Sequence, residues 1–208
     1  MNIININLGS FNTSKELLKH YVQEKKAHVA CLSETFELNN NVQLPGWIKF
    51  SKPRDNPQNK FPRGGVAILV NKNTKSESYD SSDLPDIEIV ACQSYVANTK
   101  VLIVCVYIQD LESLCKLCRW IDRLDETKYP HVLICGDFNS HHCHWDTTYK
   151  QKTGSEGDAM GIQLFHCMWR NHLKLLNDKK PTYKSGKTVI DLAVTRELNH
   201  LQVKSYTE

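Results

Sequence analysis

Apolar residues occur along this chain in short runs, and each run stops at a polar or glycine-containing segment. The first segment alternates, with Ile4, Ile6 and Leu8 on one face and Asn5 and Asn7 on the other, which predicts a strand that delivers Asn7 near its end. Continuous apolar runs of this length are typical of strands buried on both faces. The pattern predicts further strands at residues 29–32, 64–70, 87–95, 100–107, 132–135 and 188–194.

Three segments instead carry apolar residues at the spacing of an amphipathic helix. Helices are predicted over residues 15–26, 111–124 and 159–171, the first capped by Thr13 or Ser14. Residues 52–63 hold three prolines and are expected to form a mobile loop, and Pro181 to Tyr183 to begin an edge segment. Strands that alternate with so few helices, and that include adjacent strand pairs, favour a mixed sheet system over a doubly wound parallel sheet.

The composition indicates one globular domain of 208 residues, with 40% hydrophobic content and a sizeable core. No stretch reaches the roughly 18 apolar residues that a membrane span needs, and the N-terminal residues lack the basic and apolar regions of a secretion signal. We therefore expect no membrane partner. Four of the eight cysteines lie inside apolar runs as small hydrophobic residues, which fits a reducing compartment: Cys31, Cys92, Cys105 and Cys135.

The formal net charge of +3 is too small to demonstrate a nucleic-acid partner, but basic residues gather in two loop-like segments that could meet phosphates. On charge alone, a solvated surface is the better interpretation of both. The first cluster is Lys49, Lys52, Arg54, Lys60 and Arg63, and the second is Lys179, Lys180, Lys184 and Lys187.

Polar side chains follow the predicted strand at residues 132–135. Because strand residues alternate between faces, Asp137 and Asn139 should project together while Phe138 turns into the core. Open α/β proteins bind ligands at the carboxyl ends of strands. A carboxylate beside a carboxamide there suits a water nucleophile, whereas the simpler alternative is a strand that runs into an Asx-turn.

Four other polar residues stand at strand ends or inside strands: Asn7, Glu34, Tyr107 and Asp191. Asp191 lies within an apolar run, where an unpaired carboxylate is costly to bury, so it needs a specific partner or ties down a loop. Glu34 follows the strand at 29–32, and as a hard oxygen ligand it would suit magnesium, which keeps several of its waters.

Taken in chain order, these segments resemble the endonuclease/exonuclease/phosphatase superfamily. More narrowly, they look like the apurinic-type endonuclease domain of LINE-like (non-LTR) retrotransposons, because Asn-Ser-His-His-x-x-Trp at 139–145 and Leu-Asn-Asp-Lys-Lys-Pro-Thr at 176–182 favour that branch. No single motif is specific, but six in order are. They are Asn7, Leu-Ser-Glu-Thr at 32–35, Gly-Gly-Val-Ala-Ile-Leu-Val at 64–70, Val-Tyr at 106–107, Gly-Asp-Phe-Asn at 136–139 and Pro-Thr-Tyr to Ile-Asp-Leu at 181–192.

The resemblance implies an α/β (α+β) fold: a four-layer sandwich of two mixed β-sheets flanked by helices, as one domain over residues 1–208. It also implies an enzyme that nicks DNA with Mg²⁺, or Mn²⁺, and leaves a 3′-hydroxyl that primes reverse transcription. Such a domain acts in the nucleus after synthesis in a reducing cytoplasm. In the intact polyprotein it would have a reverse transcriptase domain as a partner.

By matching position, the resemblance assigns a role to each polar residue. Glu34 would hold the metal, Asn7 would contact the phosphate or the metal's waters, and Tyr107 would donate to the phosphate. Asp137 would orient the attacking water with Asn139 beside it, and Asp191 would hold a histidine in its correct tautomer. The substrate-binding residues would be Thr182, which is either a phosphate contact or a structural hydroxyl, Arg63 and Lys184.

Two departures from the family pattern stand out. The family's last motif, Ser-Asp-His, is absent, and none of the nine histidines lies in an equivalent context. The expectation is a chain truncated before that motif and its strand, with an exposed sheet edge and weak or no nuclease activity. Gly9 occupies a position that is acidic in repair relatives, which leaves Glu34 nearly alone as metal ligand.

Three alternatives remain open at this point. Cys115 and Cys118, with the histidines at 141–144, could bind zinc, although the cysteines fall on a helical apolar stripe. The chain could instead be another phosphoesterase of the same superfamily. It could also be a non-catalytic, domesticated DNA-binding remnant, and the missing histidine keeps that alternative open.

Overall fold

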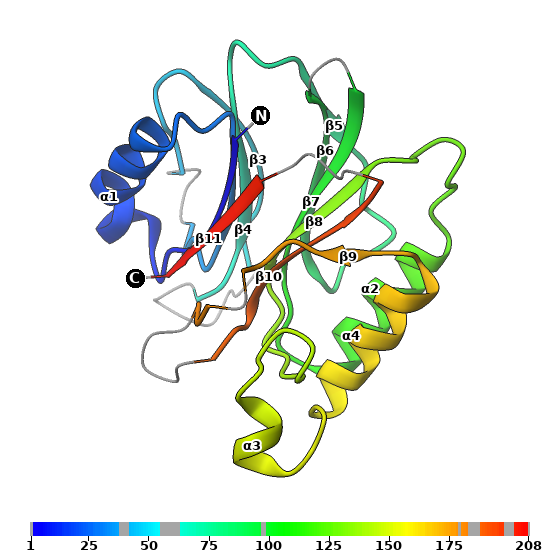
Figure 1. Cartoon of the computed structure of the whole chain (residues 1–208). Coiled ribbons are helices and arrows are strands. Elements are labelled where there is room, and N and C mark those ends of the chain that lie inside the picture. Colours follow the sequence, from blue (N-terminus) through cyan, green and yellow to red (C-terminus); the bar gives the residue numbers. More distant parts are fainter. Residues whose placement is uncertain are drawn as a thin grey trace.

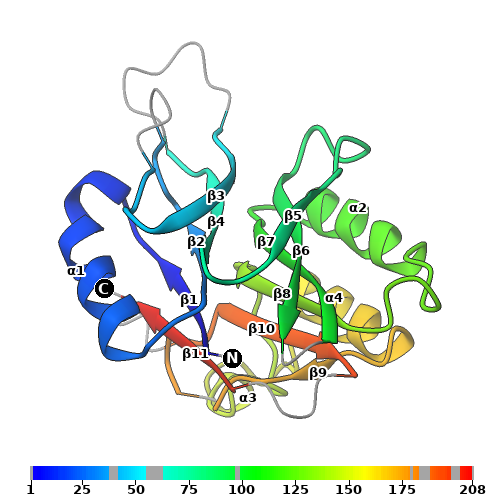
Figure 2. The ribbon, with the colours of Figure 1, turned by 90° about the horizontal axis from the view of Figure 1, so that it is seen from above.

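Two β-sheets pack face to face and carry helices on their outer faces, which gives four layers (Figure 1). The computed structural model describes residues 2–37, 42–54, 63–96, 99–178, 180–182, 188–197 and 202–207, with the backbone alone for 96 and 202–207. Seen from above, α1 lies outside one sheet, and α2 and α4 lie outside the other (Figure 2). The predicted four-layer sandwich is confirmed.

The first sheet is mixed, in the order β11-β1-β2-β4-β3. Strand β1 runs parallel to both β2 and β11, whereas β4 runs antiparallel to β2 and β3. Helix α1 (Phe11–Glu24) covers its outer face. The strands are β1 (Asn2–Asn7), β2 (Val29–Ser33), β3 (Trp47–Lys52), β4 (Val66–Asn71) and β11 (Gln202–Thr207).

The second sheet is also mixed, in the order β5-β6-β7-β8-β10-β9, and only β7 and β8 run parallel. Helices α2 (Leu111–Asp122) and α4 (Ala159–Arg170) cover it, and the short α3 (Tyr149–Thr153) lies in the connection before α4. The strands are β5 (Ser76–Tyr79), β6 (Glu88–Val96), β7 (Thr99–Tyr107), β8 (Val132–Asp137), β9 (Lys174–Leu175) and β10 (Asp191–Arg196).

Strand periodicity explains the separate cores. In β1, Ile3 faces the second sheet whereas Ile4 packs under α1. In β7, Ile103 and Cys105 face the first sheet whereas Val104 packs under the helices. Both faces of each central strand are therefore buried, as the continuous apolar runs indicate. Among the described residues, no helix is both long and apolar enough to cross a membrane.

The polar strand ends meet at one edge of the sandwich. In the second sheet, Asp137 pairs in register with Tyr107 on one side and with Asp191 on the other. In the first sheet, Asn7 pairs with Ser33, the residue before Glu34. The parallel pairs β1–β2 and β7–β8 thus bring their carboxyl ends to the same place, at the lower edge in Figure 1.

The predicted start of the first helix is wrong. Helix α1 begins at Phe11 and not at Lys15, and Ser10 occupies the capping position without a side-chain hydrogen bond. The Ser14 hydroxyl instead donates to the Leu8 carbonyl at 2.8 Å and fixes the turn from β1 into α1. The helix can start without a side-chain cap because Phe11 is buried and anchors its first turn in the core.

The last part of the chain also differs from the prediction. Strand β10 begins at Asp191, so Asp191 lies at a strand end rather than inside a strand. Thr182 lies in a bend. The predicted edge segment from Tyr183 onward lies outside the described residues, as does most of the loop at 52–63. The hydrophobic pattern did not predict β3, β5, β9, α3 or β11, which are short or lie at sheet edges.

Candidate active site

The centre of the candidate site is Asn7, which joins the two sheets. Its Nδ2 donates to Asp137 Oδ2 at 3.0 Å and to Glu34 Oε1 at 3.2 Å. The backbone N–H of Gly9 donates to Asn7 Oδ1 at 3.1 Å, which fixes the orientation of the carboxamide. Because Asp137 belongs to the second sheet, this single side chain sets the spacing of two carboxylates across the interface.

Asp137 is held on its other side by the turn that follows β8. The Asn139 backbone N–H donates to Asp137 Oδ1 at 2.9 Å, and Asn139 adopts a left-handed conformation with φ of 45°. The Asn139 carboxamide donates to the Ile108 carbonyl at 3.0 Å. The local geometry is thus an Asx-turn, in which the backbone of Asn139 rather than its side chain binds Asp137. Phe138 is fully buried, as predicted.

The environment of Asp137 changes its acidity. The residue is 2% exposed, and this burial raises the pKa of its carboxyl to about 7, with the negative charge of Glu34 acting in the same direction. The hydrogen bonds from Asn139 and Asn7 oppose the shift in pKa only in part. Near neutral pH, Asp137 therefore exists in both protonation states, as a group that transfers protons should.

Asp191 faces Asp137 across the β8–β10 pair and is 1% exposed. Burial and the charge of Asp137 hold its pKa well above the usual range. Its Oδ1 has no hydrogen-bond partner among the described residues. The sequence indicated that burial of this carboxylate is unfavourable without a specific partner, and within the described part of the structure one of its two oxygens lacks such a partner.

Thr182 lies beneath Asp191 as an anchor for the backbone. Its Oγ1 accepts hydrogen bonds from the backbone N–H groups of Ile190 and Asp191, both at 3.0 Å. Of the two roles that the sequence left open for Thr182, this geometry is that of the structural hydroxyl. Lys184, predicted alongside it, lies outside the described residues.

Tyr107 ends β7 beside Asp137 and is half-buried. Its hydroxyl oxygen accepts a hydrogen bond from Gln109 Nε2 at 3.0 Å. Burial and then the charge of Glu34 raise the pKa of Tyr107 far above its ordinary value. The phenol therefore keeps its proton at physiological pH and can act as a hydrogen-bond donor.

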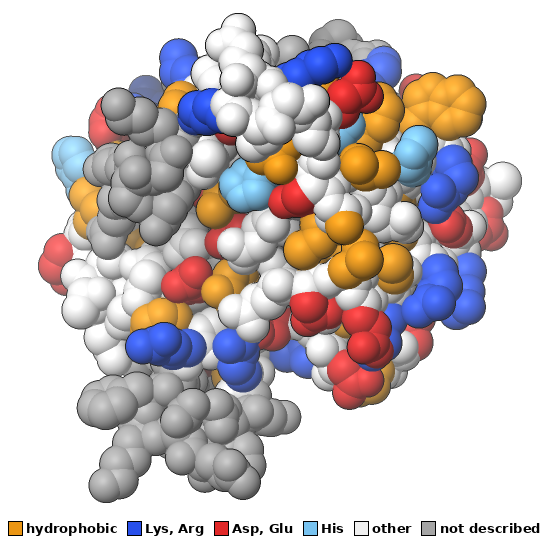
Figure 3. Space-filling model, turned by 90° about the horizontal axis from the view of Figure 1, so that it is seen from below, with side chains coloured by type: hydrophobic (Ala, Val, Ile, Leu, Met, Phe, Trp, Pro, Cys, Tyr) orange, Lys and Arg blue, Asp and Glu red, His pale blue; other side chains and the backbone are white. Residues whose placement is uncertain are grey.

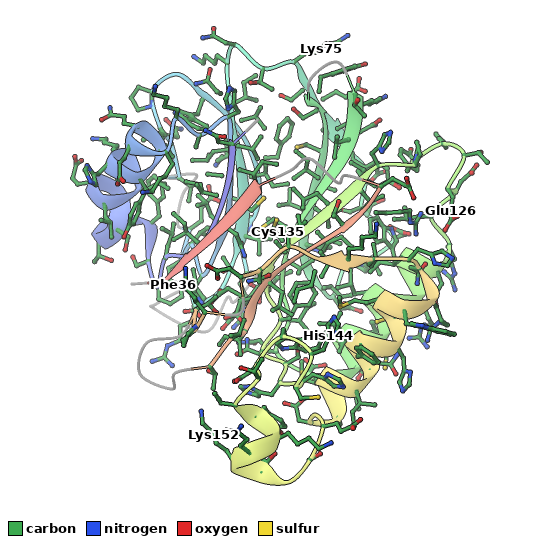
Figure 4. The ribbon with its side chains drawn as sticks, in the orientation of Figure 1. Phe36, Lys75, Glu126, Cys135, His144 and Lys152 are labelled. Carbon is green, nitrogen blue, oxygen red and sulfur yellow. The ribbon has the colours of Figure 1, made fainter. Side chains whose placement is uncertain are left out.

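Glu34 owes its position to the glycine pair that precedes β4. The next two residues, Thr35 and Phe36, donate backbone N–H groups to the carbonyls of Gly65 (3.2 Å) and Gly64 (2.9 Å). A Cβ on Gly65 would lie 2.7 Å from Thr35 Oγ1, so the close approach requires glycine. Figure 4 shows Phe36 at the lower edge of the first sheet and Cys135 between the sheets.

The side-chain oxygen atoms at this edge are of the chemical type that binds magnesium. Glu34, Asp137 and the Asn7 carboxamide offer hard oxygen atoms, and the orphaned Asp191 Oδ1 shows an excess of acceptors. In the part of the chain that the structure describes, no group of three or more His, Cys, Asp or Glu residues could cage a metal ion. Magnesium needs no such cage, since it is held by one or two carboxylates and keeps its waters.

Most of the first basic cluster is engaged within the protein. Lys49 forms an ion pair with Glu37, and Lys52 Nζ donates to the carbonyls of residues 84 and 85 at 2.9 Å. Arg54 pairs with Glu88. Arg63 is exposed ahead of β4. Seen from below, basic, acidic and histidine side chains are interspersed on this face (Figure 3).

The histidines after β8 pack against neighbouring residues and do not point toward a common metal site. His142 stacks on Phe165 with centroids 4.6 Å apart, and its Nδ1 accepts from the His144 backbone N–H at 3.1 Å. Burial lowers the pKa of His142. On α2, Cys118 is buried in the core beneath the helix. These contacts are those of core and loop packing, so no observation supports the zinc alternative.

Comparison with known proteins identifies the family. The endonuclease/exonuclease/phosphatase family matches residues 4–207. This chain belongs to that family. The membership inferred from six ordered motifs is confirmed, and because family members are nucleases and phosphatases, the chain is a hydrolase by family resemblance. No curated protein sequence matches the chain.

Solved structures of other proteins show the same fold. The endonuclease domain of TRAS1, a telomere-specific non-LTR retrotransposon, has a TM-score of 0.72 at 19% identity, and the match covers 94% of this chain and 84% of that one. The apurinic endonuclease LMAP from Leishmania major gives 0.68 at 14% identity, over 94% and 78% of the chains. The 3′ phosphatase NExo from Neisseria, bound to a product DNA hairpin, gives 0.64 at 14%, over 93% and 86%.

Sequence reasoning missed three residues beside the site: Arg54, Glu88 and Gln109. Arg54 stood in a basic cluster, and only the structure shows that its partner is Glu88. The sequence offered one usable signal, which is that Glu88 is an acidic residue at the start of the strand predicted at 87–95. Gln109 follows Tyr107 by two residues, and nothing in the sequence marked it as part of the site.

Proposed function

We propose that this chain is a DNA endonuclease domain that hydrolyses a phosphodiester bond with the help of Mg²⁺ and leaves a 3′-hydroxyl. The observation that carries the proposal is the cluster built across the two sheets, in which Asn7 bonds both Glu34 and Asp137 while Tyr107 and Asp191 flank Asp137. Phosphoryl transfer depends on positioning and charge stabilisation, which this arrangement of fixed polar groups can supply.

Each residue has a role that follows from its geometry. Glu34 and Asn7 would hold the metal ion, which supplies Lewis-acid stabilisation of phosphate charge. Tyr107 keeps its proton and donates it as a hydrogen bond to a phosphate oxygen. Asp137, with a pKa of about 7, accepts the proton of the attacking water, and the Asn139 N–H and Asn7 Nδ2 hold its carboxylate in place.

Asp191 is suited to hold a histidine, since its buried Oδ1 can accept an imidazole N–H. The 208 residues contain no Ser-Asp-His motif that would provide this histidine. A second candidate function, that of a non-catalytic DNA-binding domain, rests on this orphaned oxygen. Exposed Arg63 is a candidate contact for the DNA backbone.

The setting that we propose is target-primed reverse transcription, with the nick made in nuclear DNA and the 3′-hydroxyl extended by a reverse transcriptase. The similarity to the TRAS1 endonuclease domain supports this setting over DNA repair.

Nicking of supercoiled plasmid tests the proposal. We would compare the 208-residue chain, its Asp137→Ala variant and a version extended by a Ser-Asp-His strand, each with Mg²⁺ and with a chelator. Nicking that requires both Mg²⁺ and Asp137, with nicks that a DNA polymerase extends, supports the endonuclease. Nicking by the extended version alone would show that activity requires the histidine of the Ser-Asp-His motif. If neither the 208-residue chain nor the extended version nicks DNA but both still bind it, the result supports the non-catalytic DNA-binding domain.

A further inference from the structure

A chain of polar side chains leads from the flank of the site to Tyr107. Glu88 starts β6 and forms an ion pair with Arg54. The Arg54 Nη2 donates to Gln109 Oε1 at 2.7 Å, and Gln109 Nε2 donates to the Tyr107 hydroxyl at 3.0 Å. The guanidinium carbon of Arg54 also lies 5.5 Å from the centroid of the Tyr107 ring. These four residues form a continuous network that ends on a group of the proposed active site.

The chemistry of arginine fixes the direction of this network. A guanidinium can only donate, so the side chain of Gln109 must turn its oxygen toward Arg54 and its NH₂ toward Tyr107. The reverse amide orientation would set donor against donor at Arg54. The phenolic oxygen of Tyr107 is therefore an acceptor on this side, and its own proton has to point elsewhere.

Glu88 fixes the network at its other end. One carboxylate oxygen pairs with Arg54, and the other accepts the backbone N–H of Gly65. Gly65 in turn binds Thr35, the residue after Glu34. The side chains of Glu88 and Arg54 are 14% and 25% exposed, so solvent screens their ion pair less than an open surface pair. Gly64 has a φ of 84°, which favours glycine, and a Cβ there would lie 2.6 Å from Glu88 Oε2 and would displace that side chain.

We propose that Gln109, oriented by Arg54, is a positioning residue for Tyr107. Because the NH₂ of Gln109 donates to the phenolic oxygen, the tyrosine proton is directed away from Gln109 to the side where Glu34 accepts it in this structure. A phosphate oxygen of the substrate would take the place of Glu34 as acceptor. Arg54 belongs to the first basic cluster, which could meet phosphates, and under this proposal it acts on the substrate only through Gln109 and Tyr107. This inference rests on the proposed function, because it specifies how one group of that site is aimed.

The variant Gln109→Glu tests the direction of the hydrogen bond. It keeps an oxygen for Arg54 but replaces the NH₂ donor by an acceptor, which takes the Tyr107 proton away from the substrate. We expect kcat for plasmid nicking to fall by about tenfold or more, toward the value of Tyr107→Phe, while KM changes less than about twofold. Gln109 is exposed, so the substitution leaves the core intact. The matched control, Gln23→Glu on the exposed face of α1, adds the same charge far from the site and should leave kcat unchanged.

The double variant decides whether Gln109 acts through Tyr107. In a Tyr107→Phe background, Gln109→Glu should cause no further loss, since the proton that it misdirects is already absent. A full additional loss in that background overturns the inference, and so does a Gln109→Glu variant that nicks like the native chain.

A spectroscopic readout separates this inference from the proposed function. The ¹³Cζ chemical shift of Tyr107, assigned by its loss in Tyr107→Phe, reports whether the phenolic oxygen accepts or the hydroxyl donates. It should move in Gln109→Glu and stay fixed in Gln23→Glu. If the native chain does not nick DNA but this shift moves, the endonuclease proposal fails while the hydrogen-bond geometry stands. An unmoved shift overturns the inference directly.

Discussion

At the scale of single residues, Asp137 shows how position sets chemistry. Its carboxyl lies at the end of a buried strand, where water cannot solvate the ionised form, and Glu34 adds a second negative charge nearby. Two hydrogen bonds keep the carboxylate oriented but do not compensate for lost solvation. The same features that suit Asp137 to the proposed role of proton acceptor near neutral pH therefore make its ionisation unfavourable for the fold.

The pH dependence of stability should show this penalty. The folded state raises the pKa of Asp137 from its ordinary 3.8 to about 7, so the stabilisation by its neutral form is complete below pH 3.8 and is lost as the pH rises through about 7. Relative to Asp137→Asn, the native chain should lose up to about 4 kcal/mol of unfolding free energy between pH 4 and pH 8. Urea unfolding without divalent metal measures this difference, and parallel curves for the two proteins would contradict it.

Gly136, directly before Asp137, is the second residue-scale determinant. Its φ is 143°, and an added Cβ would lie 1.9 Å from the Val106 carbonyl oxygen on the neighbouring strand. Gly136→Ala should therefore lower the unfolding free energy by about 3 kcal/mol or more, through strain and through separation of β7 from β8. Gly154→Ala is the control, because Gly154 also has a positive φ (74°) but nothing lies within 4 Å of its added Cβ. It should cost about 1 kcal/mol. Equal losses measured in urea would show that steric overlap at Gly136 is not the cause.

At the scale of elements, the start of β10 depends on one hydroxyl. Thr182 Oγ1 accepts hydrogen bonds from the backbone N–H groups of Ile190 and Asp191. These two residues lie where β10 begins, and the hydroxyl serves as their acceptor there. The orientation of Asp191 against Asp137 thus depends on a residue outside the strand.

Replacement of this hydroxyl should affect both stability and the site. Thr182→Val leaves two backbone N–H groups without their acceptor and should reduce the unfolding free energy by about 2 kcal/mol. Thr182→Ser keeps the oxygen and should lose less than about half as much. If the serine variant is as unstable as the valine variant, the methyl group rather than the hydroxyl holds the segment.

The strands of this protein were predictable and their surroundings were less so. The runs at residues 29–32, 64–70 and 100–107 gave β2, β4 and β7 nearly to the residue, because burial on both faces leaves a continuous apolar pattern. The start of α1 was not predictable from cap chemistry, since Ser10 makes no capping hydrogen bond and Phe11 anchors the helix through the core. Short edge strands such as β5 bury too little to leave a pattern.

The same distinction holds for the site. Asn7, Tyr107 and Asp137 stand at strand ends, so topology alone brings them together. Gln109 and Arg54 act through contacts that depend on register and side-chain direction, with no repeated spacing in the sequence. Network partners of this kind become visible only when the fold sets residues 55 positions apart within hydrogen-bond distance.

At the scale of the whole molecule, the site is also a junction between the sheets. Asn7 belongs to the first sheet and Asp137 to the second, and their hydrogen bond crosses a mostly apolar interface, as does that from Asn5 Nδ2 to the Leu192 carbonyl at 3.3 Å. A cation bound by Glu34 and its neighbours would therefore join the two halves of the sandwich. Its binding free energy would add to the stability of the whole fold, because the unfolded chain holds no such site.

Magnesium should accordingly stabilise the protein in a pH-dependent way. At pH 8 Asp137, whose pKa is about 7, is mostly ionised and can attract a cation, so Mg²⁺ at about a hundredfold excess over its dissociation constant should raise the unfolding free energy by about 2.7 kcal/mol. At pH 5 protons occupy Asp137, whose pKa is about 7, and the increase should be much smaller. Glu34→Gln should abolish the increase, whereas Glu16→Gln, on the exposed face of α1, should leave it unchanged. Urea unfolding with and without Mg²⁺ measures all four cases. An increase that survives Glu34→Gln, or that is equal at both pH values, would place the metal elsewhere and would remove the reason for treating the cluster between the sheets as its site.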